Sequence, residues 1–171
     1  MTTANKLTFL RIVLIPVFLL ILYLGFTGSN WWALGVFIAA SLTDTLDGYV
    51  ARHYNQITNM GKFMDPLADK MLTMAAMCWF VQNGQMTGWV LAAVLLREFA
   101  VAGVRLVAVE QGRVIAAAWS GKIKTFVTMV CLCFMLGFNI GWLNLVCQVL
   151  ILGVTLYSGV EYIVKNRDVF R

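Results

Sequence analysis

The chain has 171 residues, of which 61% are hydrophobic and only 12% are charged, and its formal net charge is +5. Soluble domains are nearer half apolar and about a quarter charged, so this composition excludes a soluble monomer and predicts a helical membrane protein. Attraction to an anionic membrane surface accounts for the positive charge better than nucleic-acid binding does, and we expect no nucleic-acid partner.

Apolar stretches of the length needed to cross a bilayer recur six times along the chain. The bilayer core requires about 20 apolar residues per helix, and breaks rich in glycine and asparagine separate the stretches. The predicted spans are residues 7–26, 31–51, 63–82, 87–108, 120–138 and 141–163. The sequence therefore predicts an all-α, polytopic membrane protein with six transmembrane helices, in which residues 1–171 form a single domain.

Among the connections between these spans, only alternate ones contain lysine or arginine. The connections 27–31, 82–87 and 138–142 contain none, whereas the other connections and both ends of the chain are basic. Basic segments flanking spans stay in the cytoplasm, and an even number of spans also places the two ends on one side. We expect a multi-pass protein of the cell membrane with both termini cytoplasmic.

Four aspartates lie near the predicted cytoplasmic ends of the second and third spans. Asp44 and Asp47 are three residues apart, and Asp65 and Asp69 are four apart, so each pair shares one face of a helix. Ionisable residues inside a membrane are costly and usually functional. Four carboxylates repel one another unless cations join them, and such oxygen ligands suit Mg²⁺ or Mn²⁺. We expect two metal ions here; a salt-bridged pair locking two helices is the structural alternative.

The residues around these aspartates form a longer pattern. The chain reads Asp44-Thr-Leu-Asp47-Gly48-Tyr-Val-Ala51-Arg52, then eight residues, then Gly61-Lys-Phe-Met-Asp65-Pro-Leu-Ala-Asp69. This pattern resembles the CDP-alcohol phosphatidyltransferase family at every defining position of its motif. The resemblance implies a six-helix membrane fold that forms a homodimer, with an active site opening to the cytoplasm.

The same resemblance implies roles for the individual residues. Asp44, Asp47 and Asp65 would bind metal, and Asp69 would be both a metal ligand and the general base. The cytidine diphosphate part of the lipid substrate would be held by four neighbours, namely Gly48, Ala51, Arg52 and Gly61.

A second group of charges follows in the fourth span. Arg97, Val101 and Arg105 recur at four-residue intervals and so share one helical face. Arg97 lies too deep to reach the membrane surface, so we expect it to face a polar cavity and to pair with Glu98 or with the aspartates. A purely structural role for Arg97 and Glu98 is an open alternative.

Four cations indicate the nature of the acceptor substrate. Arg105, Arg113, Lys122 and Lys124 are predicted to lie at the cytoplasmic face. An anionic acceptor explains this cluster better than serine or inositol does, although lysines there also serve as interfacial anchors. We expect these four residues to contact an acceptor phosphate.

Segments outside the aspartate motif resemble one bacterial branch of the family. They are Asn5 to Arg11, Asn59 to Lys70, Arg97 to Arg105, and Gly121 to Thr125. That branch transfers the phosphatidyl group of CDP-diacylglycerol to sn-glycerol 3-phosphate in phospholipid biosynthesis, giving phosphatidylglycerophosphate and CMP. By this resemblance Arg11 joins the acceptor-phosphate site.

Two alternatives stay open at this stage. One is a family member with another acceptor: inositol phosphate, serine or phosphatidylglycerol. The other is a small cation transporter, for which we would expect repeated broken helices with sites at the midplane. The sequence contains no internal repeat, which favours the transferase.

Overall fold

The computed structural model describes residues 3–53, 59–113, 115 and 118–170, with side chains at 9–43, 68, 70–113, 115 and 118–169. Every element in these ranges is helical, which confirms the all-α prediction. The elements are α1 (Thr3–Leu24), α2 (Ser29–His53), α3 (Asn59–Gln82), α4 (Gly88–Glu110), α5 (Trp119–Phe138), α6 (Gly141–Lys165) and the short 3₁₀ helix η1 (Arg167–Phe170).

Each predicted span corresponds to one of the six α-helices. The helices extend beyond the apolar windows, for example to His53 in α2, because backbone hydrogen bonding continues into polar sequence. Two of the described helices, α5 and α6, are long and apolar enough to cross a bilayer, and α1 has a shorter apolar stretch at Phe9–Leu24. The six-span topology stays a prediction.

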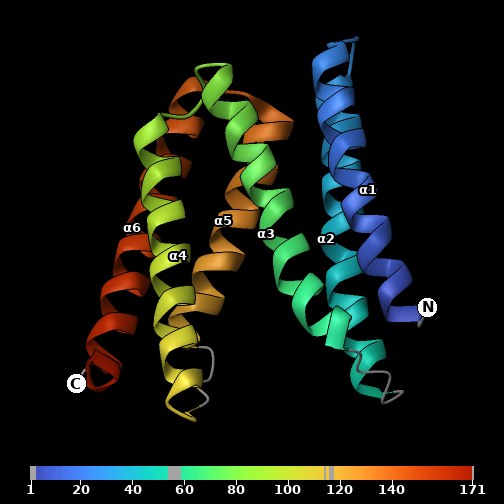
Figure 1. The fold of residues 1–171 in the computed structure, drawn as a ribbon. Helices are drawn as coiled ribbons and strands as arrows, with labels where there is room; N and C mark the ends of the chain where they lie inside the picture. The colour runs from blue at the N-terminus through green and yellow to red at the C-terminus, as the bar shows by residue number, and fades with distance from the viewer. Residues whose placement is uncertain (1–2, 54–58, 114, 116–117, 171) are drawn as a thin grey trace. The chain divides into compact units, whose positions relative to one another are not determined.

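The described chain divides into two compact units. The first comprises residues 1–79 and 136–138, and the second comprises 80–135 and 139–171. Within the first unit, α1 and α2 lie side by side and antiparallel (Figure 1). Phe18 of α1 packs against Phe37 of α2 with ring centroids 5.9 Å apart. Ala33 and Ala40 are fully buried one turn to either side of Phe37, and such small residues let two helix backbones approach closely.

Aromatic contacts tie two further segments to the α1–α2 pair. Tyr23 at the end of α1 meets Trp79 of α3 edge to face, with centroids 4.8 Å apart. Trp31 in the first turn of α2 meets Phe138 at 6.1 Å in the same geometry. These pairs anchor the first unit at the ends of its helices that carry no basic residue.

In the second unit, α4 and α6 run parallel and side by side, and α5 runs antiparallel to both (Figure 1). Gln148 of α6 fastens the turn before α4, because its side-chain oxygen accepts from the Thr87 backbone N–H at 2.8 Å. Its side-chain nitrogen donates to the Gln85 carbonyl at 3.1 Å. This clamp fixes the register of α4 against α6, and so the relative heights of the charged residues further along both helices.

Candidate active site

The backbone places the four aspartates on two consecutive helices of the first unit. Asp44 and Asp47 lie in the second half of α2, and Asp65 and Asp69 lie in the first half of α3. Because both segments are helical, the spacings of three and four put each pair on one face. Five residues separate α2 from α3, and a chain that short spans at most about 20 Å. The end of α2 and the start of α3 therefore lie within about 20 Å of each other.

The side chains of all four aspartates lie outside the described residues. Among the side chains that the structure describes, no group of three or more histidine, cysteine or acidic residues converges as a metal site would. The prediction of two metal ions therefore stays a prediction. The same holds for the residues expected to bind cytidine diphosphate: Gly48, Ala51 and Arg52 near the end of α2, and Gly61 in the first turn of α3.

A buried charge network joins α4, α5 and α6 in the second unit. Glu98 accepts hydrogen bonds from Arg97 Nη1 at 2.8 Å and from Lys124 Nζ at 2.9 Å. Arg97 Nε also donates to Ser158 Oγ at 3.1 Å. The side chains of Glu98 and Lys124 are only 10% and 7% exposed. Of the two partners expected for Arg97, the structure shows Glu98. Lys124 is a buried member of the same ion-paired cluster rather than an interfacial anchor.

Two glycines make room for the Arg97 side chain. A Cβ atom on Gly159 of α6 would lie 3.1 Å from Arg97 Cγ, and one on Gly121 of α5 would lie 3.2 Å from Arg97 Nη2. Both distances are tighter than ordinary contact between carbon atoms or with nitrogen. The Arg97 side chain thus lies in a slot between α5 and α6. A larger residue in place of either glycine would narrow this slot.

Arg105, two turns beyond Arg97, reaches α6 through an aromatic partner. Its Nε donates to the Tyr162 hydroxyl at 3.1 Å, and its Cζ lies 5.6 Å from the centroid of the tyrosine ring. The predicted common face of Arg97, Val101 and Arg105 is confirmed: Val101 is buried between two arginines that both contact α6.

The end of α4 positions Arg113. Gly112 has a φ of +73°, the left-handed conformation that glycine adopts most easily. The backbone N–H of Arg113 donates to Ala108 O at 2.8 Å, and that of Gly112 to Val109 O at 2.9 Å, which is the Schellman ending of a helix. Arg113 is therefore the first residue after the Schellman ending of α4, and its side chain lies just beyond the last turn of that helix.

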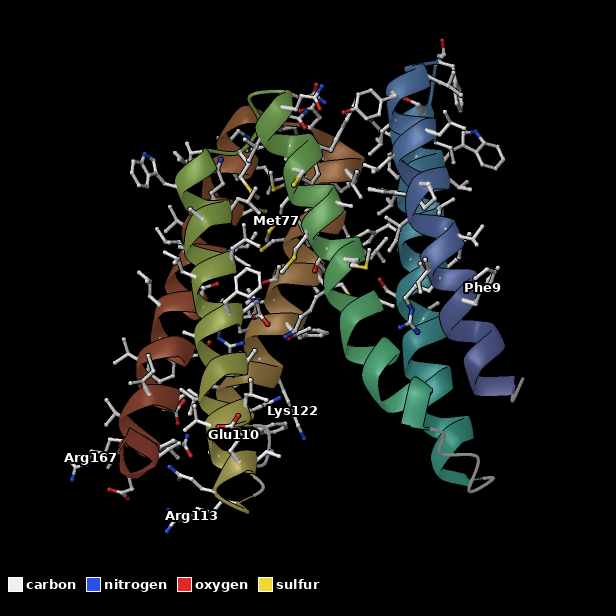
Figure 2. The ribbon with its side chains drawn as sticks, in the orientation of Figure 1. Phe9, Met77, Glu110, Arg113, Lys122 and Arg167 are labelled. Atoms are coloured by element: carbon white, nitrogen blue, oxygen red, sulfur yellow. The ribbon has the colours of Figure 1, made fainter. Side chains whose placement is uncertain are left out.

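Basic side chains collect at this end of the second unit. Figure 2 shows Arg113, Lys122 and Arg167 together at one end of the three helices. Arg105, Arg113 and Lys122 are exposed, and within the described ranges none of the three is paired with a carboxylate. Lys122 contacts an aromatic ring, with Nζ 5.4 Å from the centroid of Trp119. These three cations are available to an anion.

The remaining two predicted phosphate contacts differ from these three. Lys124 is buried against Glu98. Arg11, on α1 in the first unit, is only 1% exposed. Their roles as acceptor contacts stay predictions.

Sequence reasoning missed Ser158 and Tyr162, the residues of α6 that hold the two arginines. A signal for them is present: Asn144, Gln148, Thr155, Ser158 and Tyr162 recur at intervals of three, four or seven along an otherwise apolar helix. Such a stripe marks the face that packs inward. Its partners on α4, about 60 positions away, depend on tertiary register and are not readable from spacing.

Comparison with known proteins gives these features a context. The family described as CDP-alcohol phosphatidyltransferase matches residues 1–157. A Bacillus subtilis protein named CDP-diacylglycerol–glycerol-3-phosphate 3-phosphatidyltransferase is 38% identical over 98% of this chain and 96% of its own length. Proteins of the same name from Shigella flexneri and Escherichia coli K12 are 36% and 38% identical, over 94% and 76% of this chain and 92% and 74% of their own lengths. The chain belongs to the CDP-alcohol phosphatidyltransferase family.

Proposed function

We propose that this protein transfers the phosphatidyl group of CDP-diacylglycerol to sn-glycerol 3-phosphate, releasing CMP and forming phosphatidylglycerophosphate. The observation that carries the proposal is the similarity, over almost the whole chain, to relatives named for this reaction. Family membership also argues against the cation-transporter alternative.

The reaction exchanges one phosphorus–oxygen bond for another. The primary hydroxyl of glycerol 3-phosphate attacks the phosphorus that carries the diacylglycerol, and the bond from that phosphorus to the CMP oxygen breaks. We assign the hydroxyl proton to the Asp69 carboxylate, which acts as general base. Gly48, Ala51, Arg52 and Gly61 hold the cytidine diphosphate, as the family motif implies.

We assign a divalent metal site to the four aspartates. The donor set fits Mg²⁺ or Mn²⁺, since all four ligands are hard carboxylate oxygens, and α2 and α3 each present two of them at helical spacing. When bound, two such ions neutralise the charge of the diphosphate and make CMP a better leaving group. Asp44, Asp47 and Asp65 hold the ions, and Asp69 both binds metal and accepts the proton.

The acceptor phosphate is assigned to Arg105, Arg113 and Lys122. All three are exposed cations without a carboxylate partner in the described part of the chain, whereas the charge of Lys124 is balanced by Glu98. Guanidinium groups bind phosphate oxygens through two parallel hydrogen bonds. An acceptor without a phosphate group, such as serine or inositol, would leave most of this positive charge unused.

An acceptor panel tests the proposed function. Purified protein with CDP-diacylglycerol and Mg²⁺ should release CMP rapidly with glycerol 3-phosphate, and much more slowly with glycerol, serine, myo-inositol, inositol phosphate or phosphatidylglycerol. A charge-assisted contact to phosphate contributes about 1.5–3 kcal/mol, so Arg113→Ala should raise the KM for glycerol 3-phosphate about 10- to 150-fold. Equal use of an uncharged alcohol would refute the assignment of the acceptor.

We further propose that the protein is a multi-pass homodimer of the cell membrane, with both termini and the active site on the cytoplasmic side. In the second unit, the end opposite the basic residues carries the exposed Trp89 and Trp142, as an interfacial aromatic belt does.

Single cysteines in a variant lacking the four native ones test this topology. Impermeant thiol reagents should label Ser29→Cys, Gln85→Cys and Asn139→Cys from outside the cell. They should reach Asn55→Cys, Gln111→Cys and Asn166→Cys only after lysis. A mixture of the two patterns would overturn the six-span arrangement, and chemical cross-linking in membranes tests the dimer.

A further inference from the structure

Tyr162 is a buried tyrosine to which the proposed reaction assigns no part. Its side chain is only 1% exposed and lies in an apolar cluster with Val101, Val104 and Ala108 of α4 and Val169 of η1. A tyrosine buried in this way has a fixed ring, and its hydroxyl usually finds a hydrogen-bond partner. The partner here is Arg105.

The contact constrains Arg105 in two ways at once. The hydroxyl accepts from Nε at 3.1 Å, and the guanidinium carbon lies 5.6 Å from the ring centroid, within the range of a cation–π interaction. A guanidinium group is planar and carries five N–H donors in a fixed fork. Once Nε is bonded, the two terminal nitrogens remain, and neither has a hydrogen-bond partner among the described residues. They form the edge that binds a phosphate through two parallel bonds.

Two further hydrogen bonds fix the surroundings of Tyr162. Asn166 Nδ2 donates to the Tyr162 carbonyl at 2.7 Å, and Gln111 Nε2 donates to the Val169 carbonyl at 3.0 Å. Val169 is thereby held in the apolar cluster that contains the tyrosine ring. Arg105 is exposed, yet it is hydrogen-bonded to a tyrosine that is packed in this cluster, so the direction of its guanidinium group is constrained.

We propose that Tyr162 is a positioning residue for the acceptor phosphate and acts by aiming the terminal nitrogens of Arg105. This inference rests on the proposed function, because it takes Arg105 to be a phosphate contact. A flexible arginine loses rotamer freedom when it binds a ligand, and a preorganised one has lost it already. Tyr162 therefore contributes to acceptor affinity without touching the acceptor.

A double-mutant cycle tests the coupling. Arg105→Ala, Tyr162→Phe and the double variant are compared with the unmutated enzyme in kcat and in the KM values of both substrates. Tyr162→Phe removes one oxygen and keeps the ring. The matched control is Tyr157→Phe, the same change at an exposed tyrosine of α6.

The expected result is specific to one kinetic constant. Loss of one hydrogen bond should raise the KM for glycerol 3-phosphate about 3- to 10-fold in Tyr162→Phe, with kcat and the KM for CDP-diacylglycerol unchanged. In the Arg105→Ala background the same substitution should have no further effect, because nothing is left to aim. Tyr157→Phe should match the unmutated enzyme in all three constants.

A second variant keeps the inference testable if Tyr162→Phe folds poorly. Arg105→Lys keeps the positive charge but has neither the Nε donor nor the planar fork, so it should raise the acceptor KM nearly as much as Arg105→Ala does. An unchanged KM in Arg105→Lys would overturn the proposal, since charge alone would then suffice.

The remaining outcomes separate the two claims. If Arg105→Ala leaves the acceptor KM unchanged, the assignment of the phosphate to Arg105 is wrong and the inference fails with it. If Arg105→Ala raises that KM but Tyr162→Phe has the same fold-effect in both backgrounds, or lowers kcat instead, Tyr162 only supports packing. The phosphate assignment would then survive alone.

Discussion

Replacing Glu98 by glutamine should destabilise the second unit more than any other single change to a charged residue of α4. The substitution keeps the size of the side chain but removes the negative charge that two buried cations share, at 2.8 Å from Arg97 and 2.9 Å from Lys124. Breaking a buried ion pair by removing one partner costs about 3–5 kcal/mol. For a chain of this size, that cost corresponds to a fall in Tm of about 6–20 °C.

Thermal unfolding of the detergent-purified protein, followed by far-UV circular dichroism, measures this effect. Glu110→Gln is the matched control, because Glu110 is an exposed residue at the end of the same helix, and its Tm should change little. Adding Lys124→Met to Glu98→Gln should recover part of the loss, since one uncompensated cation is removed. If Glu98→Gln melts within a degree or two of the unmutated protein, the ion pairs do not stabilise the fold as argued.

Three further predictions concern the four aspartates of α2 and α3 and the glycines that contact Arg97. Asp44→Asn should abolish transfer in a protein that still inserts and folds, and EDTA should do the same reversibly to the unmutated enzyme; full activity in excess EDTA would end the metal hypothesis. Asp69→Asn should lower kcat by at least about 10²-fold while CDP-diacylglycerol still binds, and near-normal turnover would remove Asp69 from the mechanism. Gly159→Ala should cost about 1–3 kcal/mol by crowding Arg97, measured as a lower Tm, whereas Gly153→Ala, where the new Cβ meets nothing within 4 Å, should not.

The sequence predicts the helices well because their signal is local. Runs of about 20 apolar residues and the breaks between them depend on neighbours along the chain, and α4, for example, begins and ends within two residues of the predicted span. The Schellman ending at Gly112 is also a local feature, since its hydrogen bonds join residues three and five positions apart. The aspartate spacing is also local, and its helical setting in α2 and α3 agrees with expectation.

The contacts between helices are a different kind of information. Proximity in the chain suggested Glu98 as one partner for Arg97, but Lys124 reaches the same carboxylate from 26 residues away. Tyr162 meets Arg105 from 57 residues away. Both contacts depend on the register of packed helices, which the clamp of Gln148 on the turn before α4 helps to set. Periodicity identifies the inward face of α6 and leaves its partners undetermined.

The adjacency of Arg97 and Glu98 has a consequence for biogenesis on the proposed topology. Each charged side chain at the centre of a helix costs about 2.5–3.5 kcal/mol on scales of membrane insertion, and α4 carries both. Because Arg97 Nη1 reaches Glu98 within the same helix, the two charges can neutralise each other before α5 and α6 have been synthesised. The fourth helix can then enter the bilayer as a nearly neutral segment. Lys124 and Ser158 join the pair later, when the helices that carry them arrive.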